Sequence, residues 1–111
     1  MSDTRPIAHM VYFALHDGSA ENIRKLTESC YRHLETIPGI TFFGAGPLVE
    51  ELSRPVNVRD FHVALQVVFA TKADHDAYQQ DPHHQAFIAE NKPSWASVRI
   101  FDSWIGTGKT P

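Results

Sequence analysis

The chain has 111 residues, of which 42% are hydrophobic and 21% charged, and its formal net charge is −3. These values are typical of one globular domain, with no excess of basic residues that would make nucleic acid or a membrane an expected partner. The single cysteine, Cys30, excludes an internal disulfide. Residues 1–6 lack the apolar core of a signal peptide, and no segment reaches membrane-spanning length, so we expect a cytoplasmic protein.

The first half of the chain predicts a strand, a helix and a second strand. Residues 7–15 are nearly all apolar, as expected of a buried strand. Ser19 is suited to cap a helix that ends before Pro38-Gly39, because apolar residues recur between them at a spacing near 3.6. Residues 40–49 predict a second strand that two glycines and a proline interrupt.

The second half predicts a strand, a divided helix and a last strand. Residues 60–69 give the clearest strand pattern, and Thr71 can cap the helix that follows. Asp81, placed before a proline, is a good N-cap for a further helix over about residues 82–90. Residues 96–105 predict the final strand. We expect one domain over residues 1–111, with its core at 7–105 and a flexible tail at 106–111.

This order is β-α-β-β-α-β with a split second helix, which predicts an α+β fold with a four-stranded antiparallel sheet and helices on one face. In the third strand, one face is wholly apolar and should meet the helices: Phe61, Val63, Leu65, Val67 and Phe69. The opposite sheet face carries Met10, Tyr12 and Val68, which one protomer does not cover. A homodimer is therefore expected.

Three polar side chains are candidates for chemistry. Tyr78 lies near the end of one predicted helix and His84 in the first turn of the next, while His9 lies on the strand face toward the helices. A neutral imidazole can take a proton while a phenol donates a hydrogen bond to a developing oxyanion, so the three would act as catalytic residues of one pocket. Alternatively, they are interior polar groups that satisfy one another and the backbone.

The pocket should have apolar walls from Val11, Phe13, Val63 and Leu65, which would bind a small apolar metabolite. His75 precedes Tyr78 by three residues and could approach the pocket rim. Histidines and carboxylates do not occur at the spacings typical of metal-binding motifs, so we expect neither a metal nor another cofactor.

A series of short motifs runs along the chain: His9-Met10-Val11, Pro38-Gly39-Ile40, Asp60-Phe61, Val68-Phe69, Tyr78-x3-Pro82-x-His84 and Phe101-Asp102. Their order and spacing over about residues 7–104 resemble the stress-responsive dimeric α/β barrel (Dabb) family. The resemblance implies a ferredoxin-like fold that pairs into a dimeric α/β barrel. Most members of that family have no assigned activity.

Within this family the chain is distantly similar to polyketide cyclases of the olivetolic acid cyclase type. Their pocket uses a histidine on strand one, a histidine on strand three, a helix tyrosine and a histidine after the proline. His9, Tyr78 and His84 match this set, but Val63 stands at the strand-three position. The neighbouring His62 should point to the other face, toward a partner protomer. We therefore expect no aldol cyclisation of long polyketides.

Three functions are compatible with these observations. The leading expectation is a dimeric barrel protein that binds a small apolar or aromatic metabolite between sheet and helices, with cofactor-free acid–base catalysis as a further step. An alternative, suggested by analogy with other proteins of the same fold, is a cofactor-free monooxygenase of the dimeric-barrel type. The third expectation is a non-catalytic, stress-associated structural or ligand-binding protein.

Overall fold

The computed structural model describes residues 4–106, so residues 107–111 of the predicted flexible tail lie outside the described part. Its elements in chain order are β1 (Ile7–Leu15), α1 (Ala20–Leu34), β2 (Ile40–Pro47), β3 (Val63–Phe69), α2 (Lys72–Gln80), α3 (Pro82–Asn91), the 3-10 turn η1 (Lys92–Ser94) and β4 (Trp95–Trp104). No helix within residues 4–106 is both long enough and apolar enough to cross a lipid bilayer.

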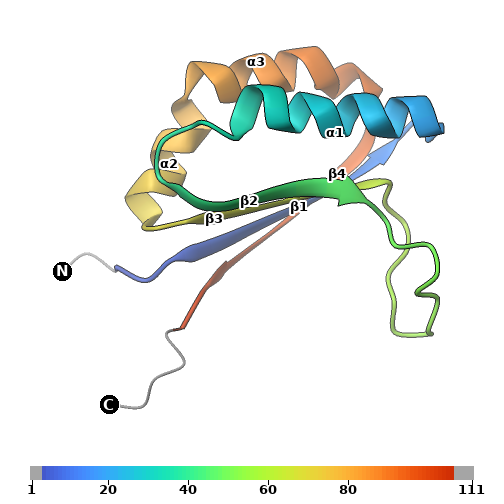
Figure 1. Ribbon diagram of the computed structural model, residues 1–111, viewed down its shortest axis with the longest axis horizontal. Coiled ribbons are helices and arrows are strands. Elements are labelled where there is room, and N and C mark those ends of the chain that lie inside the picture. The colour runs from blue at the N-terminus through green and yellow to red at the C-terminus, as the bar shows by residue number, and fades with distance from the viewer. Residues whose placement is uncertain (1–3, 107–111) are drawn as a thin grey trace.

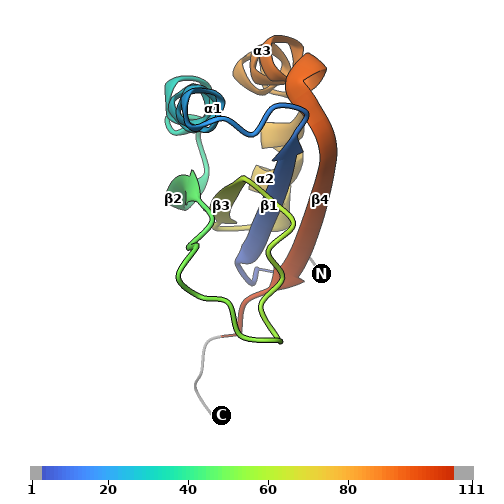
Figure 2. The same cartoon turned by 90° about the vertical axis from the view of Figure 1, so that its right-hand side faces the viewer.

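The four strands form one antiparallel sheet in the order β2-β3-β1-β4. All three helices lie over the same face, with α1 and α3 side by side and α2 beneath the start of α3 (Figures 1 and 2). The opposite face has no helix over it, and the long connection between β2 and β3 extends to that side (Figure 1). The predicted α+β, ferredoxin-like arrangement is confirmed.

Local sequence signals set where each helix begins. Ser19, Thr71 and Asp81 each accept a backbone N–H from the first turn of the helix that follows, as N-caps do. Helix α1 ends at Leu34, one turn earlier than predicted. Gly39 then turns the chain into β2 with φ at 93°, a backbone region that favours glycine.

The core lies between the helices and the alternate residues of β1 and β3. Phe13, Val63 and Phe69 are among its fully buried side chains, and they pack with Leu26 and Leu34 of α1. The predicted helix-facing set of the third strand is confirmed from Val63 to Phe69, where every second residue is buried. Burial of each such side chain stabilises the fold by roughly 1.5–3 kcal/mol.

The same prediction is wrong for Phe61. Its ring contacts Tyr12 on the uncovered face, with ring centroids 5.0 Å apart. The cause is a bend at His62, because β3 begins only at Val63 and the alternation of the strand does not continue before it.

The bend also overturns the prediction that His62 faces a partner protomer. Its backbone N–H donates to the Phe13 carbonyl at 2.8 Å, and its ring Nδ1 accepts the Leu15 backbone N–H at 2.9 Å. Backbone N–H groups of a strand point within the plane of the sheet, so this ring is held at the end of β1, against Gly18. His62 therefore packs against the turn that follows β1 in its own protomer.

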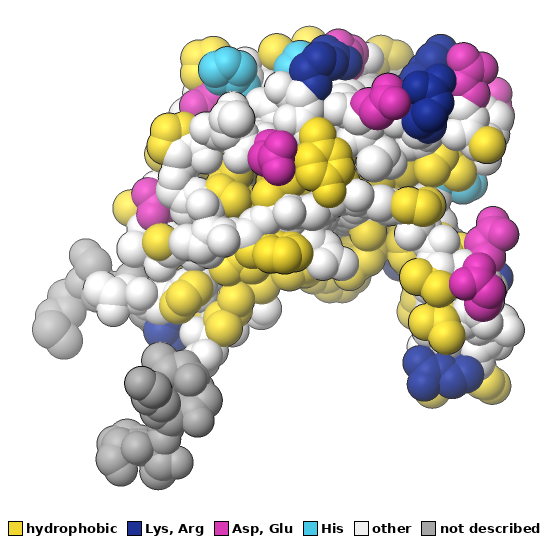
Figure 3. Space-filling model, viewed as in Figure 1, with side chains coloured by type: hydrophobic (Ala, Val, Ile, Leu, Met, Phe, Trp, Pro, Cys, Tyr) yellow, Lys and Arg dark blue, Asp and Glu magenta, His cyan; other side chains and the backbone are white. Residues whose placement is uncertain are grey.

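The uncovered face of the sheet is rich in apolar side chains. A shallow hollow of about 410 Å³ there is lined by Met10, Tyr12, Val58, Phe61, Arg99 and Phe101. Phe101, which pairs with Met10 across β1 and β4, is 56% exposed. Figure 3 shows hydrophobic side chains gathered along the lower edge of the sheet layer.

Candidate functional site

A cavity of about 140 Å³ lies between the sheet and the helices α2 and α3. Its polar lining consists of His9, Tyr78, Gln79 and His84. The rest of the wall is mostly apolar and includes Val11, Phe13, Leu65, Phe87 and Trp95, whose buried Nε1 has no hydrogen-bond partner among the described residues. The three candidate catalytic residues therefore converge on one space, as the sequence predicted.

The break between α2 and α3 brings Tyr78 and His84 together. Asp81 has an extended backbone conformation and caps α3, and Pro82 occupies the first helical position. The chain thus changes direction between the last turn of α2 and the first turn of α3. The rings of Tyr78 and His84 pack at a tilt of 50° with centroids 4.7 Å apart, and the ring of His9 lies 6.0 Å from that of Tyr78.

His84 has an unused polar atom. Its Nδ1 is buried and has no hydrogen-bond partner among the described residues. Burial and the neighbouring His9 lower the pKa of His84, while the Gln79 carbonyl and Asp81 oppose this shift. The imidazole is therefore neutral near pH 7 and can accept a proton from a bound molecule.

Tyr78 is the complementary group. The side chain is only 1% exposed, and burial raises the pKa of its phenol well above the usual range. The hydroxyl therefore stays protonated and can donate a hydrogen bond to a carbonyl or oxyanion.

His9 is held in place by Asp102, which sits beside it on β4. The two side chains meet through His9 Nδ1 and Asp102 Oδ1 at 2.5 Å. Burial lowers the pKa of His9, and the Asp102 carboxylate partly reverses the effect. Because a carboxylate only accepts hydrogen bonds, the neutral His9 ring carries its proton on Nδ1.

One expectation about the site requires correction. Val63 was expected to line the pocket, but it is fully buried in the core and is not part of the cavity wall. The bend before β3 also does not bring His62 into the cavity, so no histidine takes the strand-three position of the cyclase set. The other expected lining residues, Val11, Phe13 and Leu65, do line the cavity.

Sequence reasoning missed Asp102 as a partner of His9. The two residues are 93 positions apart, and only the register between β1 and β4 places them opposite each other. An acidic residue within an otherwise mostly apolar final strand was the available signal.

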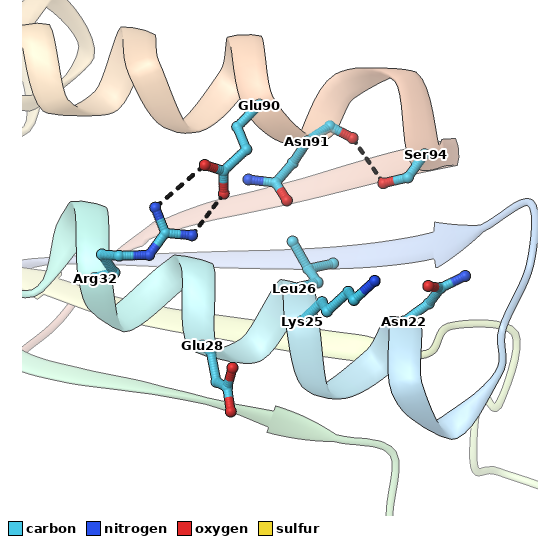
Figure 4. Close-up of a pocket in the computed structure, with 8 residues that line it drawn as sticks. All are labelled: Asn22, Lys25, Leu26, Glu28, Arg32, Glu90, Asn91 and Ser94. Atoms are coloured by element: carbon cyan, nitrogen blue, oxygen red, sulfur yellow. Dashed lines mark hydrogen bonds and ion pairs between the residues drawn. The ribbon is translucent and has the colours of Figure 1, made fainter.

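A second polar cluster lies in a groove of about 400 Å³ between α1 and α3 (Figure 4). Arg32 pairs with Glu90 at 2.8 Å, and the Ser29 hydroxyl donates to the same carboxylate at 2.6 Å. The Asn91 side-chain amide donates to Ser29 at 2.8 Å. Arg32 and Ser29 lower the pKa of Glu90 to about 2. Because these groups satisfy one another, the cluster is best explained as a link between the two helices.

Several solved structures share this fold. A Dabb family protein from Mesorhizobium loti with a ferredoxin-like fold is 24% identical, with a TM-score of 0.75 over 94% of this chain and 99% of that chain. A dimeric ferredoxin-like protein from Thermobifida fusca is 16% identical, with a TM-score of 0.76 over 95% of each chain. A hydroxynitrile lyase from Passiflora edulis is 17% identical, with a TM-score of 0.75 over 97% of this chain and 100% of that one.

Proteins from Nitrosomonas europaea and Lactobacillus acidophilus whose suggested activity is that of a monooxygenase also share the fold. Comparison with curated protein sequences finds no match. Residues 7–105 match the model of the stress responsive A/B barrel domain, named Dabb. Since this match covers every element of the sheet and the helices, the chain belongs to the stress-responsive A/B barrel (Dabb) family.

Proposed function

We propose that the cavity between the sheet and the helices α2 and α3 binds a small aromatic or apolar molecule bearing a carbonyl or hydroxyl group. The observation that carries this proposal is the buried Nδ1 of His84, which has no partner within residues 4–106 and lines the cavity together with Tyr78. A buried polar atom without a partner costs roughly 1–3 kcal/mol of stability. A ligand that bonds to it would recover much of that cost.

The size of the cavity limits the ligand. About 140 Å³ is close to the volume of an engineered protein cavity that binds benzene. One aromatic ring therefore fits, and a long polyketide chain does not. This supports the expectation that the protein lacks cyclase activity on long polyketides, in addition to the missing histidine at Val63.

The same groups support acid–base catalysis without a cofactor. His84, which burial keeps neutral, would take a proton from the substrate, and the protonated Tyr78 would donate a hydrogen bond to the oxygen that becomes negative. Asp102 would fix the ring of His9 so that its Nε2 is free to accept a second hydrogen bond. These are roles of orientation and proton transfer, which require no redox group.

We also infer that the protein works as a homodimer joined through the uncovered face of its sheet. The apolar hollow around Met10, Tyr12 and Phe101 supports this inference, as does the dimeric Thermobifida fusca structure with the same fold. Sedimentation should give a dimer at micromolar concentration, and Phe101→Glu should give a folded monomer. Ala86→Glu, at an exposed position of α3 over the other face of the sheet, is the control that should leave the dimer intact. A wild-type monomer would contradict the inference.

The ligand proposal can be tested by binding of benzaldehyde and phenol, observed by nuclear magnetic resonance. Both probes should shift the ring signals of Tyr78 and His84, and His84→Leu should abolish the shifts. His83→Gln, at the adjacent exposed histidine, is the matched control and should bind as the wild type does. Unchanged spectra at millimolar concentrations of either probe would refute a ligand site here.

Catalysis can be tested separately from binding. Since a hydroxynitrile lyase shares the fold, mandelonitrile is the first substrate to assay. In its cleavage, the base removes the hydroxyl proton, the bond between the two carbons breaks, and cyanide leaves with the electron pair. Loss of turnover in both Tyr78→Phe and His84→Leu would support the acid–base roles. Oxygen uptake with a phenolic substrate would instead favour a monooxygenase, and binding without turnover would favour a non-catalytic ligand-binding protein.

A further inference from the structure

A second group of potential ligands lies beside the cavity, where β1, α2 and β4 meet. His9, His75 and Asp102 each offer one donor atom, and these three atoms lie within 4.8 Å of one another. The rings of His9 and His75 are in edge-to-face contact, with centroids 5.2 Å apart. No spacing in the sequence indicates this group, because its members are 66 and 27 residues apart along the chain.

A carboxylate holds Nδ1 of His75, as is common for the ring nitrogen of a metal-binding histidine that does not contact the metal. Nδ1 of His75 lies 3.0 Å from Oδ1 of Asp76. Because the carboxylate only accepts, Nδ1 carries the proton of the neutral ring, and the lone pair of Nε2 accepts only a long contact of 3.5 Å from the Gln79 side-chain amide, which a metal ion would replace. A carboxylate that holds the far nitrogen of a histidine fixes its tautomer and raises its basicity as a ligand. Asp76 thus already orients the His75 ring as a ligand would require.

The third donor is accessible from solvent. The Asp102 side chain is 49% exposed, whereas that of His9 is nearly buried. A hollow of about 240 Å³ opens onto the group and is lined by Ile7, Lys72, His75, Asp102, Ser103 and Trp104. It has room for several water molecules, each of which occupies about 30 Å³ in the liquid.

The local charges are compatible with a cation. Lys72 is the positive group of the hollow, and its Nζ pairs with Asp76 at 2.8 Å. The Arg5 guanidinium also lies over the Trp104 ring of the hollow, with its Cζ 4.7 Å from the centroid, so Asp76 and Asp102 balance the two positive charges and leave no net positive charge to repel an ion. Donors of a tetrahedral ion with bonds of about 2.0–2.2 Å lie roughly 3.3–3.6 Å apart, so closure of the group needs a shift of only about 1 Å.

We propose that His9, His75 and Asp102 form a three-ligand site for a divalent transition metal of the Zn²⁺ or Co²⁺ type, with its open positions facing the hollow. Two imidazoles and one carboxylate with further positions left for water make a donor set that such ions favour. The ion would take the place of the proton between His9 Nδ1 and Asp102, this proton would move to Nε2 of His9, and the ion would join β1, α2 and β4. This site shares His9 with the cavity wall, but it uses neither Tyr78 nor His84, the two residues on which the ligand proposal rests.

The test is a titration of the full chain, without a polyhistidine tag, with Co²⁺. One ion should bind per chain and give the visible absorption of cobalt with nitrogen ligands, and Zn²⁺ should displace it. Asp76→Asn should weaken binding by about tenfold, as is typical of outer-shell carboxylates, and His75→Gln and Asp102→Asn should weaken it further. Circular dichroism should show that these variants fold.

The matched control is His83→Gln. His83 also contacts a carboxylate, that of Asp81 at 3.0 Å, but its side chain is 68% exposed and it lies outside the group. This variant should bind Co²⁺ as the wild type does. Absence of stoichiometric binding, or equal binding by wild type, His75→Gln and Asp102→Asn, would overturn the proposal. In the wild type, Zn²⁺ should also shift the ring nitrogen signal of His75, and an unchanged signal would overturn it without any variant.

Discussion

The two polar clusters of the helical layer differ in how completely their hydrogen bonds are formed. In the groove between α1 and α3, Ser29, Glu90 and Asn91 bond to one another or to Arg32. In the cavity beside α2, His84 keeps a buried nitrogen without a partner among the described residues. The first cluster lies at the contact between two helices, and the second lies where helices α2 and α3 meet the sheet. Only the second leaves hydrogen-bonding capacity for another molecule.

The difference shows why the larger groove is the weaker candidate for a binding site. Its volume of about 400 Å³ exceeds the 140 Å³ of the cavity, but its charges are already neutralised in pairs. A ligand there would have to displace the ion pair of Arg32 and Glu90. Substitutions in the groove should therefore lower the stability of the protein, whereas substitutions in the cavity should change ligand binding.

The largest effect is expected when a polar group is added where no partner exists. Val63→His would restore the histidine of the cyclase set, but Val63 is fully buried away from the cavity. We expect a loss of about 3 kcal/mol or more, from the unpaired imidazole and from overpacking, without a gain of cyclase activity. Urea unfolding measures the loss. Ala89→His, at an exposed position of α3 away from the uncovered sheet face, should cost less than about 1 kcal/mol.

A smaller loss is expected when the groove cluster is broken. Asn91→Ala removes the donor to the Ser29 hydroxyl and should lower the free energy of unfolding by about 1–2 kcal/mol. Lys25→Ala, at a side chain of the same groove that is 63% exposed, should change it by less than about 0.5 kcal/mol. Equal effects of the two variants would mean that the cluster does not link the helices.

At the cavity, a substitution is expected to raise the free energy of unfolding instead of lowering it. His84→Leu removes the unpaired nitrogen and keeps an apolar side chain, so it should raise the free energy of unfolding by about 1 kcal/mol. The same variant should lose benzaldehyde binding. If His84→Leu is less stable than the wild type, this imidazole has a structural partner. The proposed difference between the two clusters would then be wrong.

The smallest effect concerns pH. Glu90 has a pKa of about 2 in the folded protein, below its ordinary value of 4.5. Its stabilising contribution is therefore complete above pH 4.5 and declines as the pH falls toward 2. The side chain is 42% exposed, so solvent screening limits the contribution to less than about 1 kcal/mol. The difference in melting temperature between wild type and Glu90→Gln should narrow below pH 4.5, and a constant difference would contradict this assignment.

Patterns local in sequence predicted most of the fold. The caps at Ser19, Thr71 and Asp81 and the alternation from Val63 to Phe69 depend only on near neighbours along the chain, and all appear in the structure. The convergence of Tyr78 and His84 was also predictable, because a short break between helices positions both.

Features that depend on strand register were not predictable in the same way. The bend at His62 ends the alternation one residue before β3. Phe61 therefore lies on the opposite face from the one predicted, and the His62 ring lies against the end of β1 instead of facing a partner protomer. The contact between His9 and Asp102 requires the pairing of β1 with β4, strands that begin almost ninety residues apart. No local pattern contains that information.

The position of His62 has a consequence for how this chain can change in evolution. Its ring lies so close to Gly18 that a Cβ on residue 18 would come within 2.1 Å of Nε2. Residues 18 and 62 should therefore covary among relatives: those with a side chain at 18 should carry a small residue at 62. If His62 is first replaced by a smaller residue, a larger residue can then be accepted at position 18. If Gly18 is replaced first, the new side chain clashes with the His62 ring. The order of the two substitutions is thus constrained, and it can be read from reconstructed ancestors.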